Sequence, residues 1–211
     1  MRYAGLGHFG RIATRLAVWF SPPYYGRSHL ARLNPKGYFS PSAIIHHESK
    51  CFGPNVFVGD HVVIFQAVDG GAVELDERVH IYGDTYIQTG SGGSVKIGCN
   101  SHIHPRCQLS AYKSRILIGR DVQIAPNCAF YPYNHGIAPG RLIQEQPLES
   151  KGDIVIEDDT WLGFGVIVLD GVRIGKGAVV GAGSIVSKDI PDGAIAVGSP
   201  ARVVKMRRDI Q

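Results

Sequence analysis

The chain has 211 residues, of which 44% are hydrophobic and 19% are charged, and its formal net charge is +4. This composition and the 27 glycines indicate one elongated domain with a narrow core and many turns. Basic and aromatic residues are not interleaved, which excludes the pattern typical of a nucleic-acid-binding surface. No nucleic acid partner is therefore expected.

Four cysteines are present: Cys51, Cys99, Cys107 and Cys128. They form no CxxC pair and no signal peptide precedes them, so we expect reduced thiols in a cytoplasmic protein. Cys107 and Cys128 fall at inward positions of the repeat described below. We expect both to be small buried apolar residues.

Residues 1–39 lack this repeat and are predicted to form a helical cap. Large apolar residues share one helical face: Ile12, Leu16, Trp19 and Phe20. Arg11 and Arg15 flank this face, and Ser21-Pro22-Pro23 ends the run, which is too short and too charged to span a bilayer. Two interpretations stay open: the helix covers the open end of the repeat and protects a strand edge, or it makes a peripheral contact with a membrane.

Residues 40–200 carry an aliphatic or aromatic residue at every sixth position, a period that belongs to neither an α-helix nor an ordinary strand. The upstream trios are Phe52, Val58 and Ile64; Leu75, Ile81 and Ile87; Ile97, Ile103 and Leu109; and Ile118, Ile124 and Phe130. The last run is unbroken: Ile156, Leu162, Val168, Ile174, Val180 and Val186. Four places after each of these lies a small or aliphatic residue that should also point inward: Thr160, Val166, Val172, Ala178, Ser184 and Ile190.

A six-residue unit cannot bury its apolar face alone, so copies must stack into a coil with a shared core. Three units would close one triangular turn, with parallel strands about 4.8 Å apart. The predicted fold is therefore an all-β parallel β-helix. The phase of the repeat slips at residues 69–71, 89–96, 111–115 and 132–153, which we interpret as loops pushed out of the coil. The last is a long excursion loop.

Several motifs follow one another in the second half of the chain: Ile124-Ala125-Pro126-Asn127, His135 eight residues later, Asp159-Thr160-Trp161-Leu162-Gly163, Gly181-Ala182-Gly183-Ser184, Lys188-Asp189-Ile190-Pro191 and Gly198-Ser199-Pro200-Ala201-Arg202-Val203. Together they resemble the hexapeptide-repeat O-acetyltransferases, the family of the galactoside, maltose and nodulation-factor acetyltransferases, over about residues 118–205. The resemblance implies a left-handed β-helix and a homotrimer with active sites between neighbouring subunits. It also implies acetyl-CoA as donor and a hydroxyl, usually on a sugar, as acceptor.

The resemblance also implies catalytic roles. A sugar hydroxyl must lose its proton as it attacks the thioester, which requires a base that titrates near neutral pH. His135 matches the family's base, Asn127 matches the residue that contacts the acceptor, and the main-chain N–H of Phe164 matches the proposed oxyanion donor. His135 could instead be an ordinary loop histidine and Asn127 a turn residue. The family often has a small residue at position 164, so the phenylalanine is expected to alter the pocket.

The contacts to coenzyme A that the resemblance implies are Trp161, Gly163, Ala182, Lys188, Arg202 and Lys205. Trp161 would wall the channel, the main chain at Gly163 and Ala182 would meet the pantetheine arm, and the cations would meet the phosphates. Trp161 could instead pack between subunits. The basic segment 201–211 could be a solvated tail.

The sequence thus predicts an acetyl-CoA-dependent O-acetyltransferase of a saccharide or saccharide-linked acceptor, acting in surface polysaccharide synthesis. An alternative is an N-acetyltransferase of an amino sugar. A zinc-dependent carbonic anhydrase-like protein is a further alternative, because His80, His102 and His135 share one place in the six-residue unit and His104 lies close by. The offset between His102 and His104 is wrong for the ligand pair of that family, and no metal is expected. A non-catalytic scaffold is the last alternative.

Overall fold

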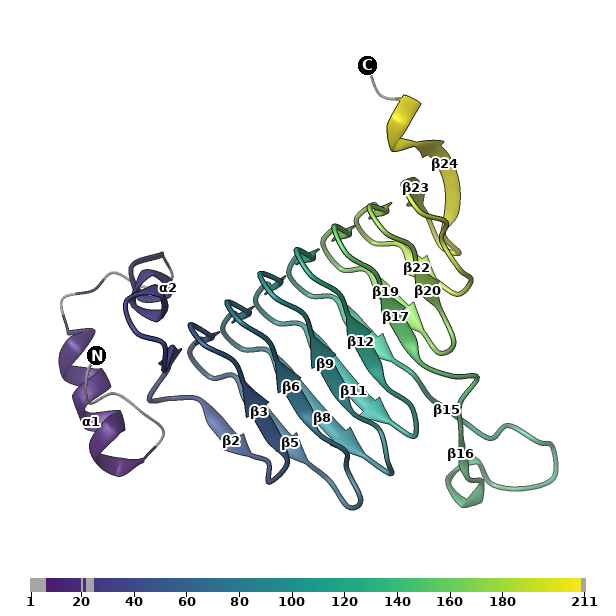
Figure 1. Cartoon of the computed structure of the whole chain (residues 1–211). Helices are drawn as coiled ribbons and strands as arrows, with labels where there is room; N and C mark the ends of the chain where they lie inside the picture. The colour runs from purple at the N-terminus through teal and green to yellow at the C-terminus, as the bar shows by residue number, and fades with distance from the viewer. Residues whose placement is uncertain (1–6, 20, 22–24, 210–211) are drawn as a thin grey trace.

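In the computed structural model, described for residues 7–19, 21 and 25–209, the chain forms a triangular coil of stacked strands with two short helices at its N-terminal end (Figure 1). Each full turn of the coil adds one parallel strand to each of three sheets, here called sheets A, B and C. The predicted parallel β-helix is confirmed. Its handedness stays a prediction.

Sheet A consists of β1 (Tyr38–Phe39), β4 (Phe57–Val58), β7 (His80–Ile81), β10 (His102–Ile103), β13 (Gln123–Ile124), β18 (Trp161–Leu162), β21 (Val179–Val180), β23 (Ala194–Val197) and β24 (Arg202–Met206). Sheet B consists of β2 (Ile44–His46), β5 (Val63–Gln66), β8 (Tyr86–Gly90), β11 (Gln108–Tyr112), β14 (Ala129–Tyr131), β19 (Ile167–Leu169) and β22 (Ile185–Val186). Sheet C consists of β3 (Lys50–Phe52), β6 (Val73–Leu75), β9 (Val95–Ile97), β12 (Ile116–Ile118), β17 (Ile154–Ile156) and β20 (Arg173–Ile174). All neighbours pair in parallel except β23 and β24, which pair antiparallel.

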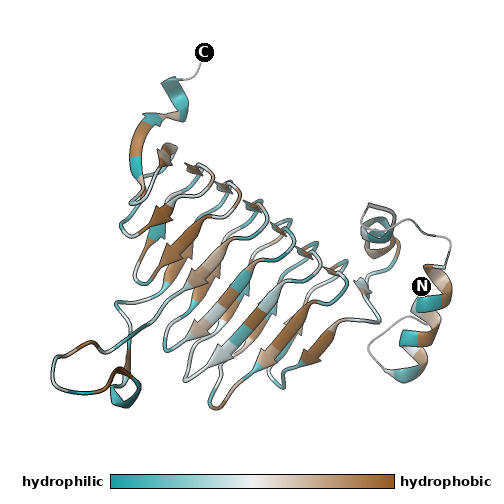
Figure 2. Ribbon diagram, turned by 180° about the vertical axis from the view of Figure 1, so that it is seen from behind, coloured by the Kyte–Doolittle hydropathy of each residue, from teal (hydrophilic) through white to brown (hydrophobic). Residues whose placement is uncertain are grey.

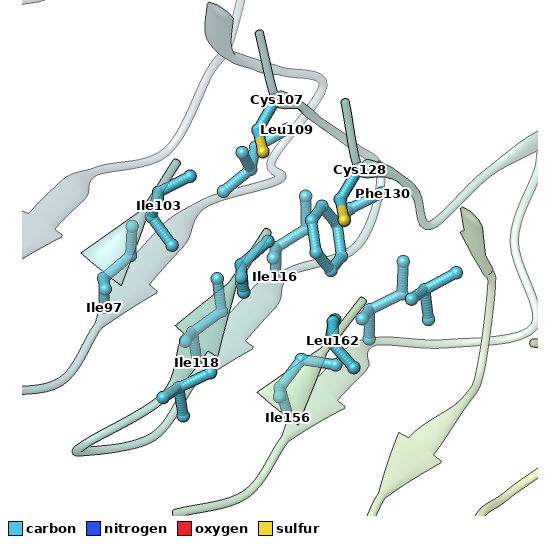
Figure 3. Packing of buried hydrophobic residues seen from close by; sticks show 14 of the residues in the cluster. Ile97, Ile103, Cys107, Leu109, Ile116, Ile118, Cys128, Phe130, Ile156 and Leu162 are labelled. Atoms are coloured by element: carbon cyan, nitrogen blue, oxygen red, sulfur yellow. The ribbon is translucent and has the colours of Figure 1, made fainter. Parts of the chain in front are cut away.

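The core is the stack of sixth-position residues, which align in register from coil to coil. Ile103 pairs with Ile124, and Ile124 with Leu162. The hydropathy colouring shows apolar segments recurring along the stacked strands (Figure 2), and the close view shows their side chains filling the interior (Figure 3). All six residues of the unbroken run and all six fourth-place residues are buried, as are Cys107 and Cys128. The predicted core positions are therefore confirmed, except that Phe52 is only partly buried and packs against the core.

Two glycines shape the corner after Leu162. Gly163 lies where a Cβ atom would come within 2.7 Å of the main-chain nitrogen of Ala182 on the next coil, so only glycine permits this approach. Gly165, two residues later, has φ +69° and turns the corner in the left-handed region. Gly163, which follows the sixth-position residue, thus allows close packing between coils. Gly165 makes the turn at the corner.

The phase slips predicted from the sequence all fall at the corner between sheet B and sheet C. They occupy the connections β5–β6, β8–β9, β11–β12 and β14–β17. The last connection is the long excursion, which folds into the antiparallel pair β15 (Asn134–His135) and β16 (Leu148–Glu149) around the 3₁₀ turn η1 (Ile143–Glu145). It projects from the coil along this edge (Figure 1).

The N-terminal segment forms α1 (His8–Ala17) and α2 (Tyr25–Arg32). α1 is the predicted helix, although Phe20, Pro22 and Pro23 lie outside the described residues. α2 packs on the outer face of sheet A, where Ala31 is buried against Tyr38 and Phe57. Within the described part of the chain, no helix has the length and hydropathy of a membrane span.

Candidate active site

His135 lies on β15 at the base of the excursion and is exposed. β15 is held by β16, with His135 opposite Leu148 in the antiparallel register. Among residues 7–19, 21 and 25–209, no side chain of the same chain forms a hydrogen bond with its imidazole. The ring is therefore presented outward on a braced strand.

A cavity of about 430 Å³ opens beside His135, where the excursion rejoins the coil. It is lined by Asn134, His135, Ile137, Glu149, Ser150, Lys151, Leu169 and Asp170. Asp170 is buried, accepts a hydrogen bond of 2.9 Å from the main-chain N–H of Lys151 and lies 3.7 Å from its ammonium nitrogen. The carboxylate of Asp170 thus holds the end of the excursion, where the chain rejoins the coil. Sequence reasoning missed it because its corner position carries no periodic signal.

Asn127 occupies the corner between sheet A and sheet B with φ +62°. Its side-chain oxygen accepts a hydrogen bond of 2.9 Å from Nε of Arg106 on the previous coil. This is the geometry of a turn residue, since asparagine tolerates the left-handed region better than most residues. The contact with an acceptor stays a prediction.

Trp161 lies on the outer face of sheet A, where 55% of its surface is exposed. It borders a cavity of about 390 Å³ that is also lined by His104, Gln123, Ala125 and Pro126. The cavity is shallow and open to solvent, and its lining is largely apolar. Trp161 can therefore stack against a ligand or against a second chain, because its indole is not used inside this one.

Two main-chain N–H groups lie at the corner between sheets A and B on successive coils, one after β18 and one after β21. Within the described residues, those of Phe164 and Ala182 have no hydrogen-bond acceptor. Gly163 differs, because its N–H donates to the carbonyl of Val180 at 2.8 Å and its own carbonyl accepts from the thiol of Cys128. The donors available to a ligand here are thus Phe164 and Ala182, while Gly163 provides close backbone approach.

The predicted phosphate-binding cations are all exposed, but they lie on two different elements. Lys188 follows β22 at the corner between sheets B and C, whereas Arg202 and Lys205 lie on β24. Arg207 is used structurally, with an ion pair of 2.9 Å to Asp159. Residues 202–209 therefore form a docked strand and the turn η2 (Arg207–Asp209).

A ladder of rings covers the upstream part of sheet A. His80 and His102 stack with centroids 4.5 Å apart, and Tyr82 stacks on His104 at 4.9 Å. Nδ1 of His80 and Nδ1 of His102 each lie 3.4 Å from the hydroxyl of Tyr82. In the described part of the chain, no group of three or more histidine, cysteine or acidic side chains is arranged to hold a metal ion. These histidines form a stacked wall.

Acid should destabilise the fold through His80. Burial, followed by the charges of His102 and Arg32, lowers the pKa of His80 from 6.5 to about 4. Between these values the unfolded chain binds a proton that the folded chain does not, so the free energy of unfolding falls as pH drops from 6.5 towards 4. We expect a loss of about 3 kcal/mol from this group.

Urea titrations near neutral pH and near pH 4 would measure this loss. The variant His80→Phe, which keeps a ring in the ladder, should lose the part of the pH dependence that His80 contributes, and His46→Phe on exposed β2 should keep it. An unchanged pH dependence in His80→Phe would contradict the assignment.

The structure divides the predicted site residues into two groups on different sides of the coil. His135 belongs to the corner between sheets B and C, whereas Trp161, Phe164 and Ala182 belong to sheet A and its corner with sheet B. In a triangular cross-section, the corner between sheets B and C lies opposite sheet A. One chain therefore does not join the base candidate to the main-chain donors.

Comparison with known proteins explains the repeat. Residues 153–188 match the family model of the bacterial transferase hexapeptide, six repeats. The hexapeptide repeat of that model is thus present in residues 153–188. A segment of 62 residues is 47% identical to the 2,3,4,5-tetrahydropyridine-2,6-dicarboxylate N-acetyltransferase of Staphylococcus aureus, covering 29% of this chain and 26% of that enzyme. This hexapeptide-repeat chain thus spans about a quarter of the length of the curated relative it matches.

Solved structures share the fold over most of the chain. The polySia-specific acetyltransferase NeuO superimposes with a TM-score of 0.54 at 22% identity, covering 80% of this chain and 88% of NeuO. A mutant of AntD, an N-acyltransferase from Bacillus cereus in complex with dTDP and Coenzyme A, gives a TM-score of 0.50 at 20% identity, covering 90% and 92%. At these identities the likeness shows the fold alone.

Proposed function

We propose that this hexapeptide-repeat protein is an O-acetyltransferase that transfers the acetyl group of acetyl-CoA to a hydroxyl of a saccharide or saccharide-linked acceptor. The observation that carries the proposal is the outward imidazole of His135 on a braced excursion, combined with main-chain donors at Phe164 and Ala182 that have no acceptor within the described residues. Sugar-modifying neighbours such as NeuO support the acceptor class.

The active unit in this proposal is a homotrimer. His135 lies at the corner between sheets B and C, and the donors at Phe164 and Ala182 lie at the corner between sheets A and B, so in this proposal a second chain supplies the complementary half of each site. The exposed Trp161 then lies between chains, where it walls the donor channel. The mature assembly would act in the cytoplasm, in the synthesis of a surface polysaccharide.

In the proposed reaction, His135 accepts the proton of the acceptor hydroxyl while its oxygen bonds to the acetyl carbonyl carbon. The N–H of Phe164 donates to the carbonyl oxygen, where negative charge develops. The carbon–sulfur bond then breaks, and the imidazolium of His135 returns the proton to the departing thiolate. No covalent acyl-enzyme is needed, and Cys128 is buried and unsuited to carry one.

N-acetylation of an amino sugar is the second candidate, and two comparisons favour it. The curated relative is an N-acetyltransferase, and AntD is an N-acyltransferase whose complex contains dTDP and Coenzyme A. An amine is already nucleophilic once deprotonated, so it depends less on a base at the site. The two candidates thus differ in how strongly they need His135.

The decisive experiment measures thiol release from acetyl-CoA with a panel of neutral sugars and matched amino sugars. We expect turnover on at least one hydroxyl acceptor and an ester in the product. An amide as the sole product would support the second candidate. The absence of turnover with all acceptors, together with no affinity for coenzyme A, would leave a scaffold.

Lys188 should affect the donor and not the chemistry. Its ammonium group is exposed, without an ion-pair partner in the described residues, and suited to a phosphate of coenzyme A. We expect Lys188→Ala to raise the KM for acetyl-CoA about tenfold with little change in kcat. Steady-state kinetics with varied donor would measure this. Lys36→Ala, at an equally exposed lysine near the N-terminus, should leave both constants unchanged.

A further inference from the structure

The helix α1 presents its large apolar residues to solvent and its small and polar residues to the protein. The exposed fractions are 89% for Phe9, 56% for Ile12, 67% for Leu16 and 75% for Trp19, just past the helix end. Thr14, on the other side, is buried and bonds to the carbonyl of Gly10 at 2.8 Å. This is the reverse of a helix that packs its apolar face on a core.

These exposed residues form one continuous stripe, called here the α1 face: Phe9, Ile12, Leu16 and Trp19. Their spacing of three, four and three residues places them on one side of a helix. Figure 2 shows apolar colour on this helix at the end of the coil opposite β24. Contiguous exposed apolar surface of this kind marks an interaction site.

The charge around the α1 face is entirely positive. The first 47 residues of the chain contain six lysines or arginines and no acidic residue, while the remaining residues contain 16 basic and 18 acidic ones. Arg15 is exposed on α1, and Arg32 and Lys36 follow on α2 and its loop, whereas Arg27 is ion-paired with Asp60. The N-terminal end is therefore a cationic pole on a coil whose own formal charge is slightly negative.

This charge distribution indicates which kind of partner binds the α1 face. A second copy of the same face would bring Arg15 towards another Arg15, with no acidic side chain in either segment to offset the repulsion. An anionic lipid surface offers both an apolar layer and complementary charge. Helices with aromatic and aliphatic residues on one face and arginine at its border bind in this way.

We propose that α1 docks this protein peripherally on an anionic membrane surface, with the α1 face entering the interfacial layer. α1 lies in the plane of the surface and does not cross it. In a homotrimer, which rests on the proposed function, the three α1 helices lie at one level along the threefold axis. Simultaneous contact then raises the overall affinity well above that of one helix.

The first test is sedimentation of the full-length protein with vesicles of phosphatidylcholine, with and without phosphatidylglycerol. We expect binding that requires the anionic lipid and weakens as salt is raised. Arg15→Gln should lower the partition coefficient about fivefold, and Arg141→Gln, at an exposed arginine of the excursion, should not change it. Equal binding to neutral and anionic vesicles would overturn the proposal.

A matched pair of double variants tests the apolar contact. Ile12→Gln with Leu16→Gln should lower partition at least about tenfold. The control, Leu142→Gln with Ile143→Gln, changes the same residue types at exposed fractions of 60% and 56% on the tip of the excursion. We expect the control to bind like the unaltered protein. Equal losses in both pairs would overturn the proposal.

Tryptophan emission provides a direct readout of insertion. The chain has two tryptophans, so Trp161→Phe leaves Trp19 as the single reporter. A blue shift on addition of anionic vesicles is expected, and an unchanged spectrum would contradict insertion. If the lipid-free protein forms assemblies that the Ile12 and Leu16 double variant abolishes, the α1 face belongs to a second copy and the proposal is wrong.

Discussion

Replacing His135 with alanine should lower turnover on the best hydroxyl acceptor about 10²- to 10⁴-fold, the usual contribution of a general base. The KM for acetyl-CoA should stay near its original value, because in the proposed reaction the imidazole transfers a proton between the reacting hydroxyl and the sulfur and does not bind the nucleotide part of the donor. Since His135 is exposed on a strand held by main-chain pairing, the substitution should not unfold the excursion. Steady-state kinetics with both substrates varied would measure both constants.

The control is His46→Ala, which removes another exposed strand histidine from β2 in the first coil and should leave kcat unchanged. Full turnover of His135→Ala on a hydroxyl would remove His135 as the base. If His135→Ala loses much turnover on a sugar hydroxyl and little on the corresponding amino sugar, then His135 acts by removing the proton. Equal losses on both would instead indicate a positioning function.

Phe130→Ala should lower the free energy of unfolding by about 3–5 kcal/mol, the cost of truncating a buried aromatic ring. Phe130 is fully buried in β14, paired with Leu109 on one side and Val168 on the other (Figure 3). The cavity cannot close, because the main chains of neighbouring coils are held by parallel pairing. Urea unfolding of both proteins, followed by circular dichroism, would measure the difference.

The matched control is Phe65→Ala on β5, in the same sheet. Phe65 is 38% exposed and points outward, so we expect a loss of only about 0.5 kcal/mol. Because Phe130 lies two residues before the excursion begins, the same variant should also loosen the base of β15. Equal effects of the two substitutions would mean that the interior of the coil is less tightly packed than its register implies.

The fold could be predicted because each coil buries residues at the same positions of the six-residue unit. Ile156 and Leu162 are six positions apart in the sequence and occupy equivalent positions on neighbouring faces, so a single period encodes the entire core. The phase slips were equally informative, since a residue added to a corner shifts the frame. The sequence pattern did not show that all four slips lie at one corner, because the pattern does not reveal which sheet each six-residue unit belongs to.

The site was less predictable. His135 could be named from the motif that precedes it, but Asp170 and Lys151, which hold the excursion, lie at positions without periodic constraint. α2 was missed because its contact with sheet A depends on few apolar residues, chiefly Leu30 and Ala31. The opposition of His135 and Trp161 required coordinates, since it depends on which face each coil position occupies.

All four phase slips lie at the corner between sheets B and C, so this corner is where related coils can differ in length. Segments can be lengthened, shortened or exchanged along this single seam without altering the pairing of any strand in sheets A, B or C. The side that bears Trp161 and the free amides stays constant under such exchanges. Under the proposed function, recognition of the acceptor and the phosphate contact expected at Lys188 can thus vary along this one corner while the fold is unchanged.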